Sequence, residues 1–145
     1  TQKRGMKIVD RTGIKQADSD FSTIATRIVA AKPDCVMLFT LGPSAANLAI
    51  QLKQAGLPAS VKLIGQTGLS SPQLISIGGA AVEGLIFNSD WTPGGNTPAS
   101  QAFAAAYKAI STDHPERLQR YIDRIPNYGS SFLMVKDGKF VVAPQ

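Results

Sequence analysis

The spacing of apolar residues near the start of the chain predicts an α-helix. Over residues 21–31, apolar side chains recur at the three- and four-residue intervals of one helical face: Phe21, Ile24, Ala25, Ile28 and Val29. Asp18 or Ser19 can cap the beginning of this helix. Lys32-Pro33 ends it, because the residue before a proline is driven out of the α region.

The next segment continues as a buried strand and a second helix. Residues 35–39 are apolar at every position, which is typical of a parallel strand covered on both faces. Gly42-Pro43 turns the chain, and the proline suits the first turn of a helix. The helix over residues 43–55 has its own apolar stripe and ends at Gly56, which suits a left-handed C-cap. This helix–strand–helix unit is the building block of doubly wound α/β folds.

The remaining patterns continue this alternation and finish in a hairpin. They predict further strands over residues 6–9, 61–64 and 82–87, and further helices over residues 72–77, 97–110 and 121–125. Asp137-Gly138 lies between the alternating runs 132–136 and 139–142, which is the pattern of a β-hairpin. We therefore expect an α/β fold, with a Rossmann-like, doubly wound, mostly parallel sheet and a C-terminal β-hairpin.

The composition is that of one soluble globular domain. The chain has 145 residues, of which 43% are hydrophobic and 17% are charged. Its net charge of +5 comes from lysines and arginines that are spread along the sequence, which argues against nucleic-acid binding. No run approaches the roughly 20 apolar residues of a membrane span. Residues 1–10 include basic side chains but are not followed by the apolar segment of a signal peptide. If the protein is exported, we expect these residues to follow the signal peptide.

Cysteine, histidine and glycine positions argue against metal and cofactor chemistry. The single cysteine, Cys35, allows no internal disulfide, and its apolar neighbours predict a core position rather than a reactive thiol. The single histidine, His114, lies far from it in the sequence, so no metal-ligand spacing is present. Gly65-Gln66-Thr67-Gly68 lacks the lysine and the glycine spacing of phosphate loops. We expect neither a metal nor a cofactor.

The sharpest catalytic candidate is Ser44, which lies between the predicted strand and helix as a nucleophile elbow requires. Ala46, however, occupies the position at which that motif has glycine. A nucleophilic serine also needs a base, and the only imidazole belongs to His114, next to Pro115. Serine hydrolysis is therefore a minor alternative to a structural role for Ser44 in the first helical turn.

Three loops that follow predicted strands indicate a small-molecule site. They hold Leu41-Gly42, Gln66-Thr67 and Asp90-Trp91, each after the carboxyl end of its strand. Open α/β sheets bind ligands in the crevice outside these strand ends. We expect the loops to meet at one edge of the sheet, where Trp91 is either a ligand contact or part of the core.

Several short motifs occur in an order and spacing that are specific when taken together. They are Asp20-Phe21, Ala31-Lys32-Pro33-Asp34, Gly42-Pro43-Ser44-Ala45-Ala46, Gln51-x-x-x-Ala55-Gly56-Leu57, Gly79-Ala80-Ala81-Val82-Glu83-Gly84, Asp90-Trp91 and Phe103-x-x-x-Tyr107. Together with the terminal run from Val135 to Val141, they resemble one lobe of the type I periplasmic solute-binding proteins. The resemblance is to the branch that serves ABC importers of branched-chain amino acids, amides and aromatic acids.

The resemblance implies a protein of two α/β lobes that close on a solute held between them. This chain corresponds to the C-terminal lobe, with residues 1–117 as its first segment and residues 118–145 as a return segment and hairpin of the same lobe. The N-terminal lobe, together with the first strand and most of the first helix of this lobe, has no counterpart in the sequence. Such proteins bind solutes and are not enzymes.

By the same resemblance, ligand contacts fall at Leu41 and Gly42 after the second strand and at Gln66 and Thr67 after the third. The Asp90-Trp91 loop is a further candidate. Relatives that bind amino acids often have an acidic side chain near the position of Thr67, where it pairs with the ligand's ammonium. Thr67 offers only a hydroxyl, so a carboxylate, an amide or an aromatic ligand fits at least as well as an amino acid.

The resemblance also implies partners and a location. We expect a small-molecule solute as ligand and an ABC permease as the partner of the parent protein, in the bacterial periplasm. An open sheet edge and exposed lobe surface further predict association, such as a homodimer. The alternative from another class is a ligand-sensing regulatory domain of the same fold, in which binding reports to a partner.

Overall fold

The computed structural model describes residues 5–89, 98–113 and 131–144 of the chain. Its helical elements are α1 (Ser22–Ala30), α2 (Gly42–Gln54), η2 (Thr67–Leu69), α3 (Pro72–Gly78), η3 (Gly79–Val82) and α4 (Pro98–Asp113). Its strands are β1 (Cys35–Leu38), β2 (Lys62–Gly65), β3 (Ile86–Ser89), β4 (Ser131–Lys136) and β5 (Lys139–Val142). The helix expected over 121–125 and the expected division between residues 117 and 118 lie outside the described residues, and both stay predictions.

The strands that the structure describes form one sheet in the order β1-β2-β3-β4-β5. β1, β2 and β3 are parallel, and β4 and β5 form an antiparallel hairpin that joins the sheet beside β3. The hairpin turns at Asp137 and Gly138, whose φ angles of 51° and 66° are those of a type I′ turn. The structure confirms the α/β class, the parallel strands of the core and the terminal hairpin.

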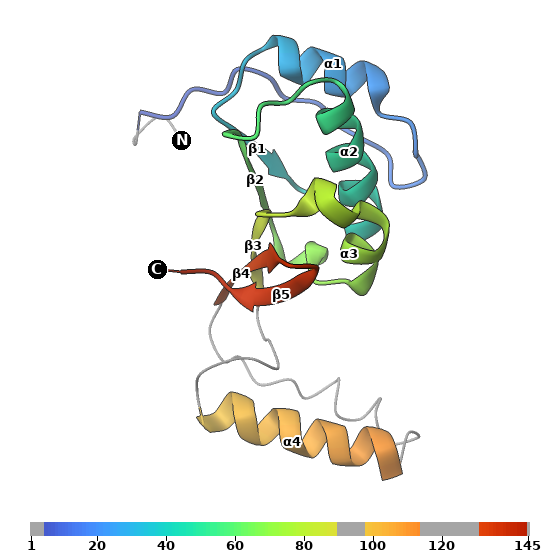
Figure 1. The fold of residues 1–145 in the computed structure, drawn as a ribbon, viewed down its shortest axis with the longest axis vertical. Helices are drawn as coiled ribbons and strands as arrows, with labels where there is room; N and C mark the ends of the chain where they lie inside the picture. The colour runs from blue at the N-terminus through green and yellow to red at the C-terminus, as the bar shows by residue number, and fades with distance from the viewer. Residues whose placement is uncertain (1–4, 90–97, 114–130, 145) are drawn as a thin grey trace.

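The helices between the parallel strands pack together beside the sheet. α2 connects β1 to β2, and it packs against α1 on one side and α3 on the other (Figure 1). Right-handed crossovers between successive parallel strands place the connecting helices on one face. The core lies between this layer and the sheet, and its largest fully buried side chains are Phe21, Phe87, Leu52, Leu69, Leu74, Leu85, Leu133, Val82 and Val135.

The ends of α1 and α2 follow from the proline and glycine that the sequence places there. Lys32, just before Pro33, leaves the helical region with a φ of 49°. Gly56 has a φ of 90°, and its N–H donates to a carbonyl of the last turn of α2. The N–H of Leu57 donates to the Leu52 carbonyl at 2.9 Å. These two bonds form a Schellman motif, which satisfies carbonyl groups that the helix leaves unpaired.

The beginning of α1 differs from the expectation that Asp18 or Ser19 caps it. Phe21 occupies the N-cap position and has no side-chain cap, and the carboxylate that reaches the first turn is that of Asp20, whose Oδ1 accepts the backbone N–H of Ser22 at 3.0 Å. This bond, followed by one from the Ser22 hydroxyl, lowers the pKa of the Asp20 carboxyl because both favour its ionised form. Three adjacent residues can all act as caps, and local pattern alone does not choose among them.

Residues 6–9 form no strand, which corrects the expectation from their apolar pattern. Met6, Ile8 and Val9 are 55%, 63% and 49% exposed. Within the described residues β1 is the edge of the sheet and pairs with β2 alone. The apolar run therefore has no neighbouring strand to supply the hydrogen bonds of a ladder.

The third parallel strand begins later than expected, at Ile86 instead of Val82. Gly84 has a φ of 76°, a left-handed conformation that ends any extended segment before it. Val82 belongs to η3 and is fully buried, and it lies against Gly78 at the end of α3. Its apolar character therefore reflects burial in a turn rather than a place in the strand.

β1 is buried on one face only, which corrects the expectation that this apolar run is covered on both. Val36 and Leu38 are buried, whereas Met37 and Phe39 are 55% and 75% exposed. Cys35 is an exposed free thiol rather than a core residue. An uninterrupted apolar run predicts a strand correctly, but it does not show whether both faces have neighbours.

An apolar row crosses the sheet on this exposed face. The strand registers align five apolar residues, one from each strand: Met37, Ile64, Ile86, Met134 and Val141. Directly paired residues point to the same face of a sheet, so these side chains form one line from β1 to β5. Phe132 lies on the same face of β4 and is 62% exposed. We call the five aligned residues the apolar row.

Candidate functional site

The carboxyl ends of β1, β2 and β3 lie at one edge of the sheet, because the three strands are parallel. Thr40 and Leu41 follow β1, Gln66 and Thr67 follow β2, and Asn88 is near the end of β3. The structure thus brings the expected contacts after the first two strands to a common edge. We call this edge, with its five named residues, the strand-end site.

Gln66 fastens the loops after β1 and β2 to each other. Its Nε2 donates to the Thr40 carbonyl at 3.1 Å, and its Oε1 accepts the backbone N–H of Gly68 at 3.1 Å. Both ends of the amide are therefore engaged within the protein. The side chain fixes the shape of the loop that presents Thr67.

Asn88 connects the third strand to the same loop. Its Nδ2 donates to Oγ1 of Thr67 at 3.2 Å, and both side chains are half-buried. Sequence reasoning missed Asn88 because it ended the strand at residue 87 and looked for contacts in the following loop. The signal that could have found it is Gly84, which delays the strand and makes Asn88 one of its last residues.

Two glycines allow the loop after β2 to approach its neighbours closely. A Cβ on Gly68 would lie 3.1 Å from Cδ2 of Leu41 and 3.1 Å from the Thr40 carbonyl oxygen. A Cβ on Gly65 would lie 2.9 Å from Cγ of Leu69, which is fully buried. The Gly-x-x-Gly spacing therefore serves packing of the strand-end site rather than phosphate binding.

Leu41 and Gly42 have different surroundings at the start of α2. Leu41 is 45% exposed and precedes the first helical residue, where it presents an apolar side chain at the edge. Gly42 is buried, and a Cβ there would lie 2.9 Å from Cβ of Ser71. Leu41 is thus available to a ligand as a side chain, whereas Gly42 is packed against the start of α3. The expected contacts Asp90 and Trp91 lie outside the described residues.

The recorded hydrogen-bond partner of the Ser44 hydroxyl is not one of the residues of the strand-end site. Ser44 is buried in the first turn of α2, and its hydroxyl donates to the Gln16 carbonyl at 3.4 Å. This contact supports the structural role for Ser44. The histidine that a hydrolytic mechanism would need, His114, lies outside the described residues.

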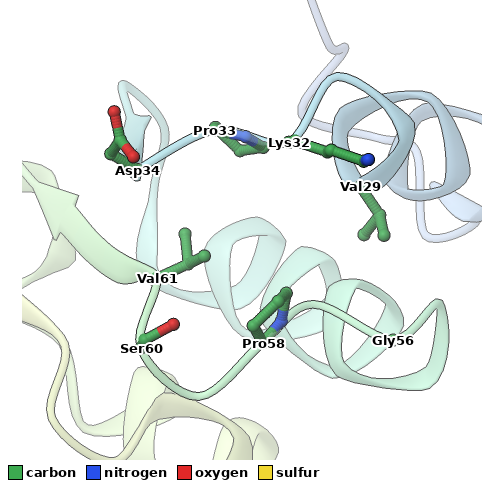
Figure 2. Close-up of a pocket in the computed structure, with 8 residues that line it drawn as sticks. All are labelled: Val29, Lys32, Pro33, Asp34, Gly56, Pro58, Ser60 and Val61. Carbon is green, nitrogen blue, oxygen red and sulfur yellow. The ribbon is translucent and has the colours of Figure 1, made fainter.

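A separate depression lies at the opposite edge of the sheet, where the chain enters β1 and β2. It has a volume of about 660 Å³ and is lined by Val29, Lys32, Pro33, Asp34, Gly56, Pro58, Ser60 and Val61. Figure 2 shows that the charged ends of Lys32 and Asp34 lie far apart and do not converge on one point. None of the expected ligand contacts lines this depression.

Neither a membrane helix nor a metal cluster occurs in the ranges that the structure describes. No helix there is long and apolar enough to cross a bilayer. No group of three or more histidine, cysteine, aspartate or glutamate side chains gathers there to hold a metal ion. The polar side chains of the strand-end site end in neutral amides and hydroxyls.

An open α/β sheet with neutral polar groups and an exposed leucine at its strand ends is an arrangement that can bind a small ligand. The chain belongs to the periplasmic binding protein family, whose model matches residues 1–122. It is 37% identical over 107 residues to the Leu/Ile/Val-binding protein BraC3 of Rhizobium johnstonii, an alignment of 72% of this chain and 28% of that protein.

Solved structures show the same fold. The leucine-binding protein LivK of Thermotoga maritima superimposes with a TM-score of 0.72 at 21% identity, over 93% of this chain and 51% of that one. The leucine-, isoleucine-, valine-, threonine- and alanine-binding protein of Brucella ovis gives a TM-score of 0.66 at 30% identity, over 79% of this chain and 29% of that one. These likenesses confirm the expected fold of one lobe.

The family also decides between two classes of protein. The family is that of the periplasmic binding proteins, and the relatives named above are described as leucine-binding or Leu/Ile/Val-binding, which confirms the expectation of a binding protein rather than an enzyme. The chain spans 28% to 32% of the length of the curated relatives it matches. It therefore corresponds to a part of those proteins.

Proposed function

We propose that the chain acts as a solute-binding lobe of an ABC importer's substrate-binding protein in the periplasm. The solute, a branched-chain amino acid or a related small amide or carboxylate, contacts the strand-end site. The relatives' names support the branched-chain class, because those aligned over most of this chain are described as Leu/Ile/Val-binding. A partner lobe would close over the solute and exclude water, and an ABC permease would receive it.

This proposal depends on one observation: hydrogen bonds connect the loop after β2 to the chain after β1 and to the end of β3, so the three strand ends form one continuous edge. Gln66 fastens the loop after β2 to Thr40, and Asn88 fastens the same loop to β3. The edge offers an apolar surface at Leu41 beside the hydroxyl of Thr67, which suits a small solute with an aliphatic part and a polar part. One lobe supplies only some of the contacts that surround such a solute, so we expect affinity in the millimolar range or weaker.

Self-association is a second part of the proposal. Met37 and Phe132 are exposed apolar side chains on this face of the sheet, and the other four members of the apolar row are half-buried. A surface of this kind favours contact with another protein, and we propose a homodimer of this chain as the simplest case.

The proposed binding site can be tested by titrating the ¹⁵N-labelled chain with leucine and following the backbone amide resonances. We expect saturable shifts confined to the strand-end site, at Leu41 and Thr67. Leu41→Asp should abolish them, because the variant replaces the apolar contact with a charge. Ile77→Asp is the matched control, since Ile77 on α3 is similarly exposed, 41% against 45% for Leu41. Shifts centred on the opposite depression, or none up to solubility, would contradict the proposal.

A further inference from the structure

Two parts of the chain have the features of paired strands but lack a partner. β1 is the first strand of the sheet, and within the described residues only β2 pairs with it. Its outer edge therefore presents backbone N–H and C=O groups that can accept another strand. Residues 6–9 have the apolar pattern of a strand, yet no backbone hydrogen bond joins them to β1 or to any other described strand. An open edge and a strand-like segment thus occur in the same chain.

An ion pair holds the end of this segment at the outer side of α1. Asp10, which directly follows residues 6–9, accepts a hydrogen bond at Oδ2 from Nε of Arg27 at 2.9 Å. Arg27 comes two residues after the fully buried Ala25, and two residues turn an α-helix by about 200°, so Arg27 lies on the face away from the core. Its side chain is 54% exposed. The end of the segment is therefore fixed on the solvent side of α1, whereas β1 lies on the core side.

Residues 6–9 match the edge of β1 in length and in alternation. β1 has four residues, which are exposed and buried in turn. In an extended conformation the apolar side chains of Met6 and Ile8 lie on one face, and the charged side chain of Lys7 lies on the other. Pairing with Met6 and Ile8 on the buried face would extend the core and leave Lys7 in water. Met6 and Ile8 are 55% and 63% exposed without a partner, so pairing would remove apolar surface from water.

We propose that residues 6–9 of one copy of the chain pair, as an added strand, with the outer edge of β1 in a second copy. Backbone hydrogen bonds provide the attraction, and the alternation of buried and exposed side chains sets the register. When both copies do this the exchange is reciprocal, so both open edges are paired and the dimer closes with two-fold symmetry. This inference goes beyond the proposed function, because the contact requires neither a solute nor the apolar row.

Cys35 makes the proposed contact measurable, because it is an exposed thiol in the first position of β1 and the only cysteine of the chain. Lys7→Cys and Val9→Cys, each combined with Cys35→Ser, are mixed separately with the unaltered chain and oxidised by copper phenanthroline. Every chain then carries one thiol, so a disulfide between residues 6–9 and β1 must join two copies. Mass spectrometry of the digested covalent dimer identifies the two linked cysteines.

We expect one of these thiols to form a disulfide with Cys35, that of Val9→Cys in an antiparallel pair or that of Lys7→Cys in a parallel pair, because both share the face of Cys35. Ile8→Cys with Cys35→Ser is the matched control. Its thiol lies on the opposite face of the added strand, so its cross-linking to Cys35 should be almost completely lost. A further variant keeps Cys35 in the same chain as the reactive new cysteine, and at low concentration it should form no internal disulfide.

Each other result overturns the inference. If neither Lys7→Cys nor Val9→Cys reacts with Cys35, residues 6–9 do not pair with β1 of a second copy. If Ile8→Cys cross-links as readily as its two neighbours, the contact is not a strand pair. If the chain that carries both thiols closes on itself as a monomer, the segment pairs with its own β1. The proposed solute site and association through the apolar row stand apart from these outcomes, because they have separate tests.

Discussion

The side-chain amide of Gln51 in α2 holds the backbone at Phe21, where α1 begins. Its Oε1 accepts the Phe21 N–H at 2.6 Å, and its Nε2 donates to the Ser19 carbonyl at 2.8 Å. Phe21 itself is almost fully buried in the core. One side chain on a neighbouring helix therefore satisfies two backbone groups and sets the position of a core aromatic residue.

Gln51→Leu should lower the free energy of unfolding by about 1–2 kcal/mol, because it leaves the N–H of Phe21 and the carbonyl of Ser19 without these partners in a half-buried place. Urea unfolding measures the effect. Gln54→Leu, at an exposed position of the same helix, should change the midpoint little. If both variants lost the same unfolding free energy, the Gln51 hydrogen bonds would make no specific contribution to stability.

Gly65→Ala should destabilise the protein by about 1–3 kcal/mol, because the new methyl group meets the buried side chain of Leu69. In the double variant with Leu69→Val, the loss of unfolding free energy should be smaller than the sum of the losses in the two single variants, because the smaller side chain leaves room for the new methyl group. Gly13→Ala is the control, because no atom lies within 4 Å of its Cβ position. Strict additivity in the double variant would refute steric conflict as the cause.

The exposed face of the sheet should make the chain associate as its concentration rises. Met37→Lys combined with Phe132→Lys places two charges on that face and should shift the sedimentation equilibrium toward monomer. Ile77→Lys, on α3, should leave the association unchanged. A monomer for the unaltered chain at high concentration would contradict the expectation.

Asp20 should make stability depend on pH in acid. Its hydrogen bonds from Ser22 hold the pKa of the folded-state carboxyl below the 3.8 of a free aspartate. A lowered folded-state pKa means that the stabilisation is complete above that free value and is lost as the pH falls through the folded-state pKa. The difference in urea midpoint between the unaltered chain and Asp20→Asn should therefore be constant near neutral pH and shrink below about pH 4. A pH-independent difference would be the contrary result.

Elements with strong local signals could be predicted from the sequence. Pro43 and Gly56 mark the two ends of α2, and Asp137-Gly138 marks the hairpin turn, because each of these residues favours a particular backbone conformation by itself. The motifs around them also carried the resemblance to the family. At these positions the local conformational preference of single residues was sufficient to predict where an element ends or turns.

Features that depend on distant neighbours could not be predicted in the same way. Residues 6–9 have the pattern of a strand, but a strand also needs a partner, and within the described residues the sheet ends at β1. Cys35 belongs to an apolar run, but its exposure depends on what covers that face. The hydrophobic pattern of a segment indicates which secondary structure it prefers, but it does not indicate which other segments lie next to it.

The candidate site was predicted in part, for the same reason. Leu41 and Thr67 follow strands that were placed nearly correctly, so their arrival at one edge could be anticipated. Asn88 was missed because the left-handed turn at Gly84 delays β3, and Gln66 was expected as a ligand contact although the structure engages both ends of its amide internally. Whether Gln66 also touches a solute stays a prediction.

The bonds that shape the strand-end site all run between parts of the protein, so its form does not depend on what binds there. A solute that meets Thr67 would give up its own freedom of motion without having to order the loop after β2, because Gln66 already holds that loop. Recognition by this lobe would then resemble the docking of two rigid bodies. Differences among solutes would arise mainly in how quickly they leave rather than in how quickly they arrive.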